Sequence, residues 1–175
     1  MKKSVMIFVV LVSGLSLAFA QTPVNLYGRG AQGANGVVAA AKPEASQVGV
    51  DILKKGGNAV DAAIATAFAL GVLEPNASGI GGGGFMIIKM ADMAEAVVVD
   101  FRESAPKAAR DTMYLGADGK VIPKSTYEGG LSVAVPGEVK GLLYAFDHYG
   151  SGKLSRMDIV QPAISWALKG VPVTV

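Results

Sequence analysis

The chain of 175 residues carries 16 Lys and Arg against 14 Asp and Glu, and two of the lysines, Lys2 and Lys3, lie in its first 20 residues. The remainder therefore holds 14 residues of each sign, and this balance excludes a general attraction to nucleic acid or anionic lipid. Cysteine is absent and His148 is the single histidine, so disulfides, thiol nucleophiles and thiolate metal sites are excluded and we expect no metal and no cofactor.

The first 20 residues have the pattern of a secretory signal peptide. A charged start precedes the apolar run Val5–Val12, and Ala18-Phe19-Ala20 is a small-x-small cleavage site. The apolar run is short and no stop-transfer segment follows, which favours a signal over a membrane span; a retained N-terminal anchor is the alternative. We expect cleavage after Ala20, a periplasmic or secreted protein, and no membrane contact once the signal is removed.

The segment after the signal begins with polar residues and continues into two predicted helices. Residues 21–33 are polar without a period and indicate an exposed lead-in, and the apolar run 36–41 indicates a short strand. Pro43 suits the first turn of a helix that ends at Gly56-Gly57. Asn58 is a good N-cap for a second helix that ends before Pro75; it is apolar on almost every side, so we expect it to be buried.

Two β-prone runs follow, at 85–90 and 96–101. Their short connection predicts an antiparallel hairpin, and the lack of alternation predicts a sheet that is covered on both faces. Residues 131–137 indicate a further short strand. A helix should then end at Gly150, and another should run from Ser155 to Gly170, with Pro162 either beginning its regular part or kinking it.

This order predicts a layered α/β arrangement in which the partner strands are missing. A lone hairpin is marginally stable, and its two apolar edges would stay open. We therefore expect the chain to be the front part of a larger domain.

The stretch 78–88, "SGIGGGGFMII", has five glycines between Gly79 and Gly84. A dinucleotide-binding loop would follow a strand and open a helix, which is the reverse of this context, and no Gly-Lys-Ser/Thr follows for a phosphate-binding loop. A flexible linker would contain serine and would not lie between two buried elements. The run thus predicts a tight crossing, in which the backbone passes where no side chain fits.

Several segments together resemble γ-glutamyltranspeptidase (glutathione hydrolase). They are "GGNAVDAAIA", "EPNASGIGGGGFMII", "VVVDFRESAP", "PGEVKGLLYAFDHYG" and "QPAISWALKG", and the resemblance runs over residues 34–175. It implies the αββα sandwich of the N-terminal-nucleophile hydrolases, of which this chain would be an incomplete front portion, the N-terminal part of the large subunit.

The resemblance also implies a mechanism. A precursor cuts itself in two and frees a threonine, whose α-amine serves as the base for its own hydroxyl. This threonine attacks the γ-glutamyl amide of glutathione or another γ-glutamyl compound, and the acyl group passes to water or to an amino-acid or dipeptide acceptor. The partner implied for this chain is the small subunit from the same precursor.

By this resemblance, Arg102 binds the α-carboxylate of the γ-glutamyl group. A guanidinium presents a planar fork that matches a carboxylate, and Arg102 follows a predicted buried strand. The alternative is an arginine that pairs with Asp100 or Glu103, or that only caps the sheet. We expect Asp100 and Glu103 to support Arg102 or to lie on the surface.

The nucleophile is not found in this chain. The family has it in a Thr-Thr-His-type segment, and none of the five threonines, Thr22, Thr66, Thr112, Thr126 and Thr174, has such neighbours. His148 has the pattern of a helix-end or surface histidine. We expect this chain alone to be inactive. Two alternatives stay open: a β-lactam or glutaryl acylase of the same superfamily, and a non-catalytic secreted fragment.

Overall fold

A computed structural model describes residues 30–171, so the predicted signal peptide, most of the predicted lead-in and the last four residues lie outside the described part. The chain divides into two units, 1–32 and 33–175. Of the first unit only residues 30–32 are described, and they are exposed. All helices and strands given below belong to the second unit.

The first two helices form as their capping residues predict. Helix α1 (Pro43–Lys54) begins with proline in its first turn, and α2 (Ala59–Leu73) begins after Asn58, whose side chain accepts hydrogen bonds from the backbone amides of Val60 and Asp61. The carboxylate of Asp61 in turn accepts a hydrogen bond from the backbone amide of Asn58 at 2.9 Å, and the two contacts form a capping box.

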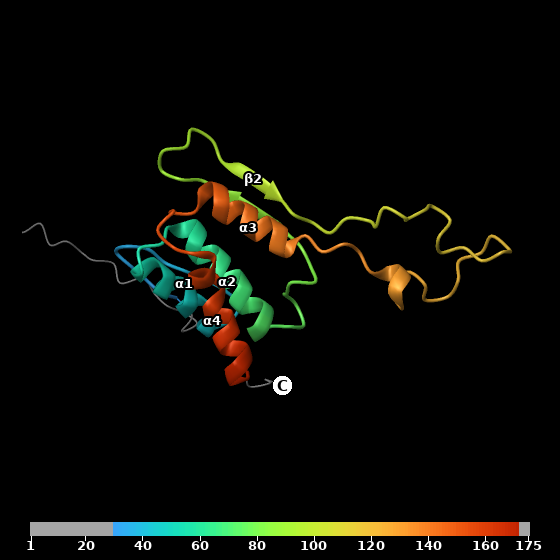
Figure 1. Ribbon diagram of the computed structural model, residues 1–175, viewed down its shortest axis with the longest axis horizontal. Helices are drawn as coiled ribbons and strands as arrows, with labels where there is room; N and C mark the ends of the chain where they lie inside the picture. Colours follow the sequence, from blue (N-terminus) through green and yellow to red (C-terminus); the bar gives the residue numbers. More distant parts are fainter. Residues whose placement is uncertain (1–29, 172–175) are drawn as a thin grey trace, which may run out of the picture. The chain divides into compact units, whose positions relative to one another are not determined.

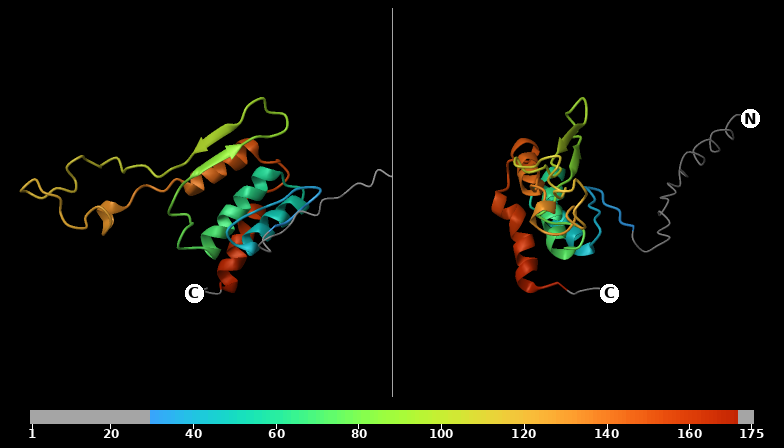
Figure 2. Two further views of the ribbon diagram at one scale, coloured as in Figure 1. Left: turned by 180° about the vertical axis from the view of Figure 1, so that it is seen from behind. Right: turned by 90° about the vertical axis from the view of Figure 1, so that its right-hand side faces the viewer.

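Helix α2 is the centre of the core. It packs against α1, against α3 (Glu138–Tyr149) and against α4 (Arg156–Lys169), as Figures 1 and 2 show. The largest fully buried apolar side chains come one from each helix: Ile52, Ile64, Leu142 and Ile159. The prediction of a buried α2 is therefore confirmed. Helix α4 begins at Arg156, so Pro162 lies inside it and does not mark its start.

Strands β1 (Phe85–Ile88) and β2 (Val97–Asp100) form the predicted antiparallel hairpin, with Phe85 opposite Asp100 and Ile88 opposite Val97. Ile88 and Val99 are buried in the helical core, while Phe85, Ile87 and Val98 are 61%, 75% and 61% exposed. Within the described residues, helices pack on one face of the hairpin only, so the expected cover of its other face stays a prediction.

Two other predicted strands do not form in the described part of the chain. Residues 36–41 have no strand partner in the described part of the chain. Within 131–137 only Val135 forms a bridge, to Ser104, and Gly130–Ser132 is a short 3-10 helix, η1. β-prone residues did not suffice here, because a strand also needs a neighbour to accept its hydrogen bonds.

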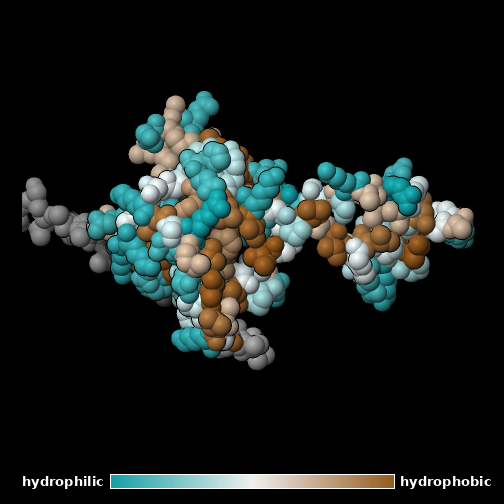
Figure 3. Space-filling model, in the orientation of Figure 1, coloured by the Kyte–Doolittle hydropathy of each residue, from teal (hydrophilic) through white to brown (hydrophobic). Residues whose placement is uncertain are grey.

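The segment between Ser104 and Val135 runs away from the helices and returns (Figure 1). Within this segment a bridge pairs Leu115 with Val121, and the hydroxyl of Tyr114 donates to the carbonyl of Leu131 at 3.1 Å. Figure 3 shows apolar surface on this segment and along α4, where Met157 and Leu168 are 60% and 83% exposed. No helix within residues 30–171 is long and apolar enough to span a bilayer.

Asp61 ties the start of α2 to the end of α3. Its side chain is fully buried, and Oδ2 accepts a hydrogen bond from the backbone amide of Ser151 at 3.0 Å in addition to that from Asn58. The side-chain amide of Asn58 donates from Nδ2 to the backbone carbonyl of Tyr149 at 2.7 Å. One capping box therefore fixes the C-terminal end of α3, 90 residues further along the chain.

Candidate functional site

The glycine run crosses two other stretches of backbone at very short range. A Cβ atom on Gly71 of α2 would lie 3.1 Å from the Cα of Gly79, and a Cβ on Gly83 would lie 2.4 Å from the carbonyl oxygen of Phe101. Real Cβ atoms are essentially never found within 3.0 Å of a backbone atom, so a side chain at Gly83 requires the backbone to move. The predicted tight crossing is thus present, between α2 and the end of β2.

The first turn of α3 is hydrogen-bonded to the same glycine run. The backbone amides of Gly137 and Glu138 both donate to the carbonyl of Gly82, at 3.0 Å each. A Cβ on Gly141 would lie 2.1 Å from the ring of Phe101, so the helix approaches that ring closely. The glycine run, the end of β2 and the first turn of α3 therefore fix one another around Phe101, the residue before Arg102.

Arg102 projects from this fixed point. Its backbone amide donates to Asp100 Oδ1 at 3.0 Å, and its Nε lies 3.4 Å from Glu103 Oε2. The side chain is 59% exposed, and among the described residues its two terminal nitrogens have no hydrogen-bond partner. Of the two predicted acids, Glu103 thus pairs with the guanidinium and Asp100 holds the backbone.

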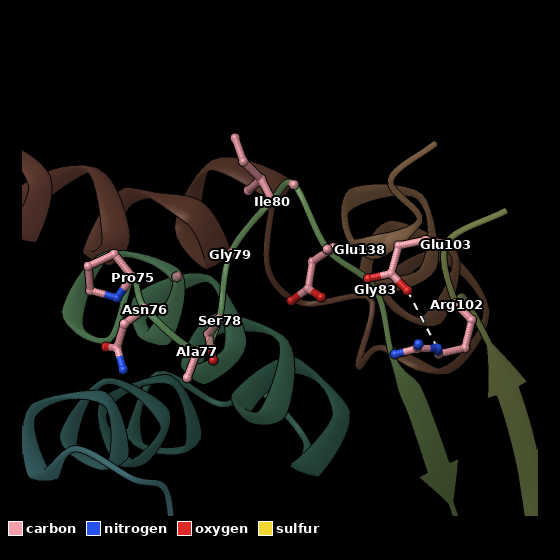
Figure 4. A pocket seen from close by; sticks show the side chains of 13 residues that line it. Pro75, Asn76, Ala77, Ser78, Gly79, Ile80, Gly83, Arg102, Glu103 and Glu138 are labelled. Carbon is pink, nitrogen blue, oxygen red and sulfur yellow. Dashed lines mark ion pairs between the residues drawn. The ribbon is translucent and has the colours of Figure 1, made fainter. Parts of the chain in front are cut away.

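Arg102 lines a cleft of about 630 Å³, which we call the first cleft. Its walls are Gly71 and the loop 75–83 on one side and Arg102, Glu103 and Glu138 on the other. Figure 4 shows these three charged side chains beside the loop through Gly83. The first cleft thus places one guanidinium next to two carboxylates.

Glu138 was not predicted as a site residue. It is the first residue of α3 and lies in the first cleft because its amide is bonded to Gly82. Burial, and then the neighbouring carboxylate of Glu103, raise the pKa of Glu138 above its ordinary value. The Pro-Gly pair before this glutamate signals a helix start, but no local signal places that start at the cleft.

The threonines that the structure describes, and the histidine considered in the sequence, do not line the first cleft. Thr66 is buried and donates its hydroxyl to the carbonyl of Ala62 at 2.8 Å. Thr112 and Thr126 lie on the segment beyond Ser104, while Thr22 and Thr174 lie outside the described residues. His148 is exposed in the last turn of α3, as predicted. Within residues 30–171 no three acidic or histidine side chains are grouped to hold a metal ion.

The family model described as gamma-glutamyltranspeptidase matches residues 45–175. The glutathione hydrolase proenzyme of Pseudomonas sp. (strain A14) is 50% identical over 136 residues, which are 78% of this chain and 23% of the relative. That of Bacillus subtilis (strain 168) is 46% identical, over 81% of this chain and 24% of the relative. The chain therefore spans about a quarter of the length of these relatives.

Solved structures confirm the α/β fold class. The γ-glutamyltranspeptidase of Helicobacter pylori superposes with a TM-score of 0.72 at 41% identity, over 77% of this chain and 38% of that one. A cephalosporin acylase from Bacillus halodurans superposes less well, with a TM-score of 0.65 at 38% identity, over 80% of this chain and 25% of that one. From the family match and these identities, the chain belongs to the γ-glutamyltranspeptidase family.

Proposed function

We propose that this chain is the front part of a precursor whose mature form transfers γ-glutamyl groups. The substrate is glutathione or another γ-glutamyl compound, and the acyl group passes through a threonine ester to water, an amino acid or a dipeptide. The relatives named as glutathione hydrolase proenzymes support this reaction class. The threonine and the rest of the acyl-binding site belong to the small subunit, which is the partner of this chain.

The observation that carries the proposal is the placement of Arg102. Backbone contacts on three sides fix the chain at Phe101, and the adjacent guanidinium is exposed toward the first cleft with its terminal nitrogens free among the described residues. A preorganised fork of this kind suits the α-carboxylate of a γ-glutamyl group, because two parallel N–H donors match two carboxylate oxygens. Glu103 holds Nε and so orients the fork.

The proposed location is outside the cytoplasm. The predicted signal at residues 1–20 supports export, and cleavage after Ala20 would leave the described unit intact. We propose a periplasmic or secreted enzyme, and these 175 residues contribute no disulfide to it, because they contain no cysteine.

The test is Arg102→Lys in the complete, processed enzyme, with Arg156→Lys as the matched control. Arg156 has the same 59% exposed side chain and also pairs with an acid, Asp147, but lies on α4, away from the first cleft. Losing one charge-assisted bond of about 1.5–3 kcal/mol should raise the KM for a γ-glutamyl anilide by about 10- to 100-fold. The control should change KM by less than about twofold, within the range of an exposed ion pair. An unchanged KM in Arg102→Lys would remove this residue from the site.

The second candidate function is that of an acylase, which the likeness to the cephalosporin acylase favours. A γ-glutamyl anilide and a glutaryl anilide differ only in the α-amino group of the acyl part. The transferase is expected to prefer the γ-glutamyl donor in kcat/KM. A preference for the glutaryl donor in kcat/KM would decide for the acylase.

A further inference from the structure

Asn35 is the one asparagine of the chain that a glycine follows; the others are Asn25, Asn58 and Asn76. It is exposed and lies in a bend ahead of the segment 36–41. Within residues 30–171 its side chain has no hydrogen-bond partner, and neither has the backbone amide of Gly36. Glycine has no Cβ, so no side chain on residue 36 shields this amide nitrogen from the carboxamide that precedes it.

The other two asparagines in the described part of the chain are held in place. Both polar atoms of the Asn58 side chain are hydrogen-bonded, Nδ2 to the carbonyl of Tyr149 at 2.7 Å and Oδ1 to two backbone amides. Asn76 is exposed, but the next amide, that of Ala77, donates to the carbonyl of Glu74 at 3.0 Å. An exposed carboxamide beside an unbonded and unshielded backbone nitrogen is thus found at Asn35 and not at these two positions.

We propose that Asn35 is a site of spontaneous covalent modification, at which asparagine is converted to aspartate and isoaspartate. The nitrogen of Gly36 loses its proton to solvent and attacks Cγ of Asn35. The new bond closes a succinimide ring, and the nitrogen of the carboxamide takes up a proton and leaves as ammonia. Water then adds to one of the two ring carbonyl carbons and the bond from that carbon to nitrogen breaks. Cleavage at Cγ gives aspartate, and cleavage at the backbone carbon gives isoaspartate.

Either product changes the start of the segment 36–41. Asn35 lines a groove of about 620 Å³ between this segment and α2, and the described residues that line the groove include no charged side chain. The modification therefore brings a carboxylate to an uncharged groove. In isoaspartate the backbone also runs through Cβ and Cγ, which adds one carbon ahead of Val38. This valine packs against α1, where a Cβ on Gly49 would lie 2.8 Å from its Cγ1.

The test follows the complete, processed enzyme during storage at mildly alkaline pH, in the folded state and unfolded in guanidinium chloride. Peptide mass spectrometry and isoaspartate labelling give the rate at each asparagine. The folded rate at Asn35 should be within about twofold of the unfolded rate, because no hydrogen bond has to open first. At Asn76 the folded rate should be about fivefold below the unfolded rate, because the bond of Ala77 must open. Both rates should rise with pH, since the attacking nitrogen must lose its proton.

The matched variant is Asn35→Gln, whose longer side chain closes a larger and less favoured ring. Gly36 is kept, because its φ of +153° strains any other residue. The variant should form no isoaspartate in the peptide that contains residue 35. Equal ratios of folded to unfolded rate at Asn35 and Asn76, an Asn35 that stays intact in the folded enzyme, or a signal that persists in Asn35→Gln would overturn this inference. The readout is chemical, so its outcome is separate from γ-glutamyl turnover.

Discussion

Gly83 is the position where the glycine run tolerates a side chain least. In Gly83→Ala the new methyl carbon would lie 2.4 Å from the carbonyl oxygen of Phe101, and 3.0 Å from the amide nitrogen of Glu103. Ordinary contact begins at 3.4 Å, so the strand end must retreat by about 1 Å, and no flexible side chain is available to absorb the shift. Because Arg102 lies between these two residues, it must move as well. A misplacement of about 1 Å in a substrate-positioning group can cost about 100-fold in rate.

The assay for this prediction is kcat/KM for a γ-glutamyl anilide in the complete enzyme, together with the thermal midpoint of unfolding. We expect Gly83→Ala to lower kcat/KM by about 100-fold and to destabilise the fold by about 1–3 kcal/mol. Gly130→Ala is the control, because a Cβ there meets no atom within 4 Å, its φ is not positive, and it lies outside the first cleft. If Gly83→Ala keeps kcat/KM within twofold of wild type and leaves the thermal midpoint unchanged, the close crossing does not determine the position of Arg102.

Asp61→Ala should lower the free energy of unfolding of the chain in urea by about 2–4 kcal/mol, because the backbone amides of Asn58 and Ser151 lose their shared buried acceptor. The control Asp51→Ala, on the exposed side of α1, should change that free energy by less than about 0.5 kcal/mol. Equal effects of the two substitutions would contradict the role of Asp61 in joining α2 to the end of α3. Glu138 has a raised pKa in the folded state, so the wild type loses stability as pH rises through that pKa. The thermal midpoint of Glu138→Gln should therefore rise relative to that of the wild type between pH 4 and pH 7. A difference in midpoint that stays constant over this pH range would argue against burial as the cause of the raised pKa. The 175-residue chain alone should release no product from a γ-glutamyl anilide, and turnover above a heat-killed control would mean that the nucleophile has been misplaced.

The helices could be predicted because their signals are local. Proline in the first turn of α1, the box of Asn58 and Asp61, and Ser155 before α4 each act within a few residues of where they stand. The hairpin was predictable for the same reason, since its two strands are joined by a short connection. The glycine run was correctly interpreted as a crossing because it stands directly between a helix and a strand and contains almost no residue except glycine.

The rest depends on contacts between residues far apart in the sequence. Asp61 has the pattern of an ordinary first-turn acid, and its bond to Ser151 spans 90 residues. Glu138 enters the first cleft only because its amide bonds to Gly82. The sequence also did not predict which face of the hairpin the helices cover. Apolar residues on both faces indicate that a strand can be buried, but they do not identify the segment that packs on each face.

The most direct test of the central claim is a crystal structure of the complete, processed enzyme with a γ-glutamyl ligand bound. The account predicts that the terminal nitrogens of Arg102 lie about 2.7–2.9 Å from both oxygens of the ligand's α-carboxylate, with the glycine run against the end of β2 as described here. A guanidinium that points away from the cavity holding the nucleophilic hydroxyl, with the α-carboxylate bound by other groups, would contradict it.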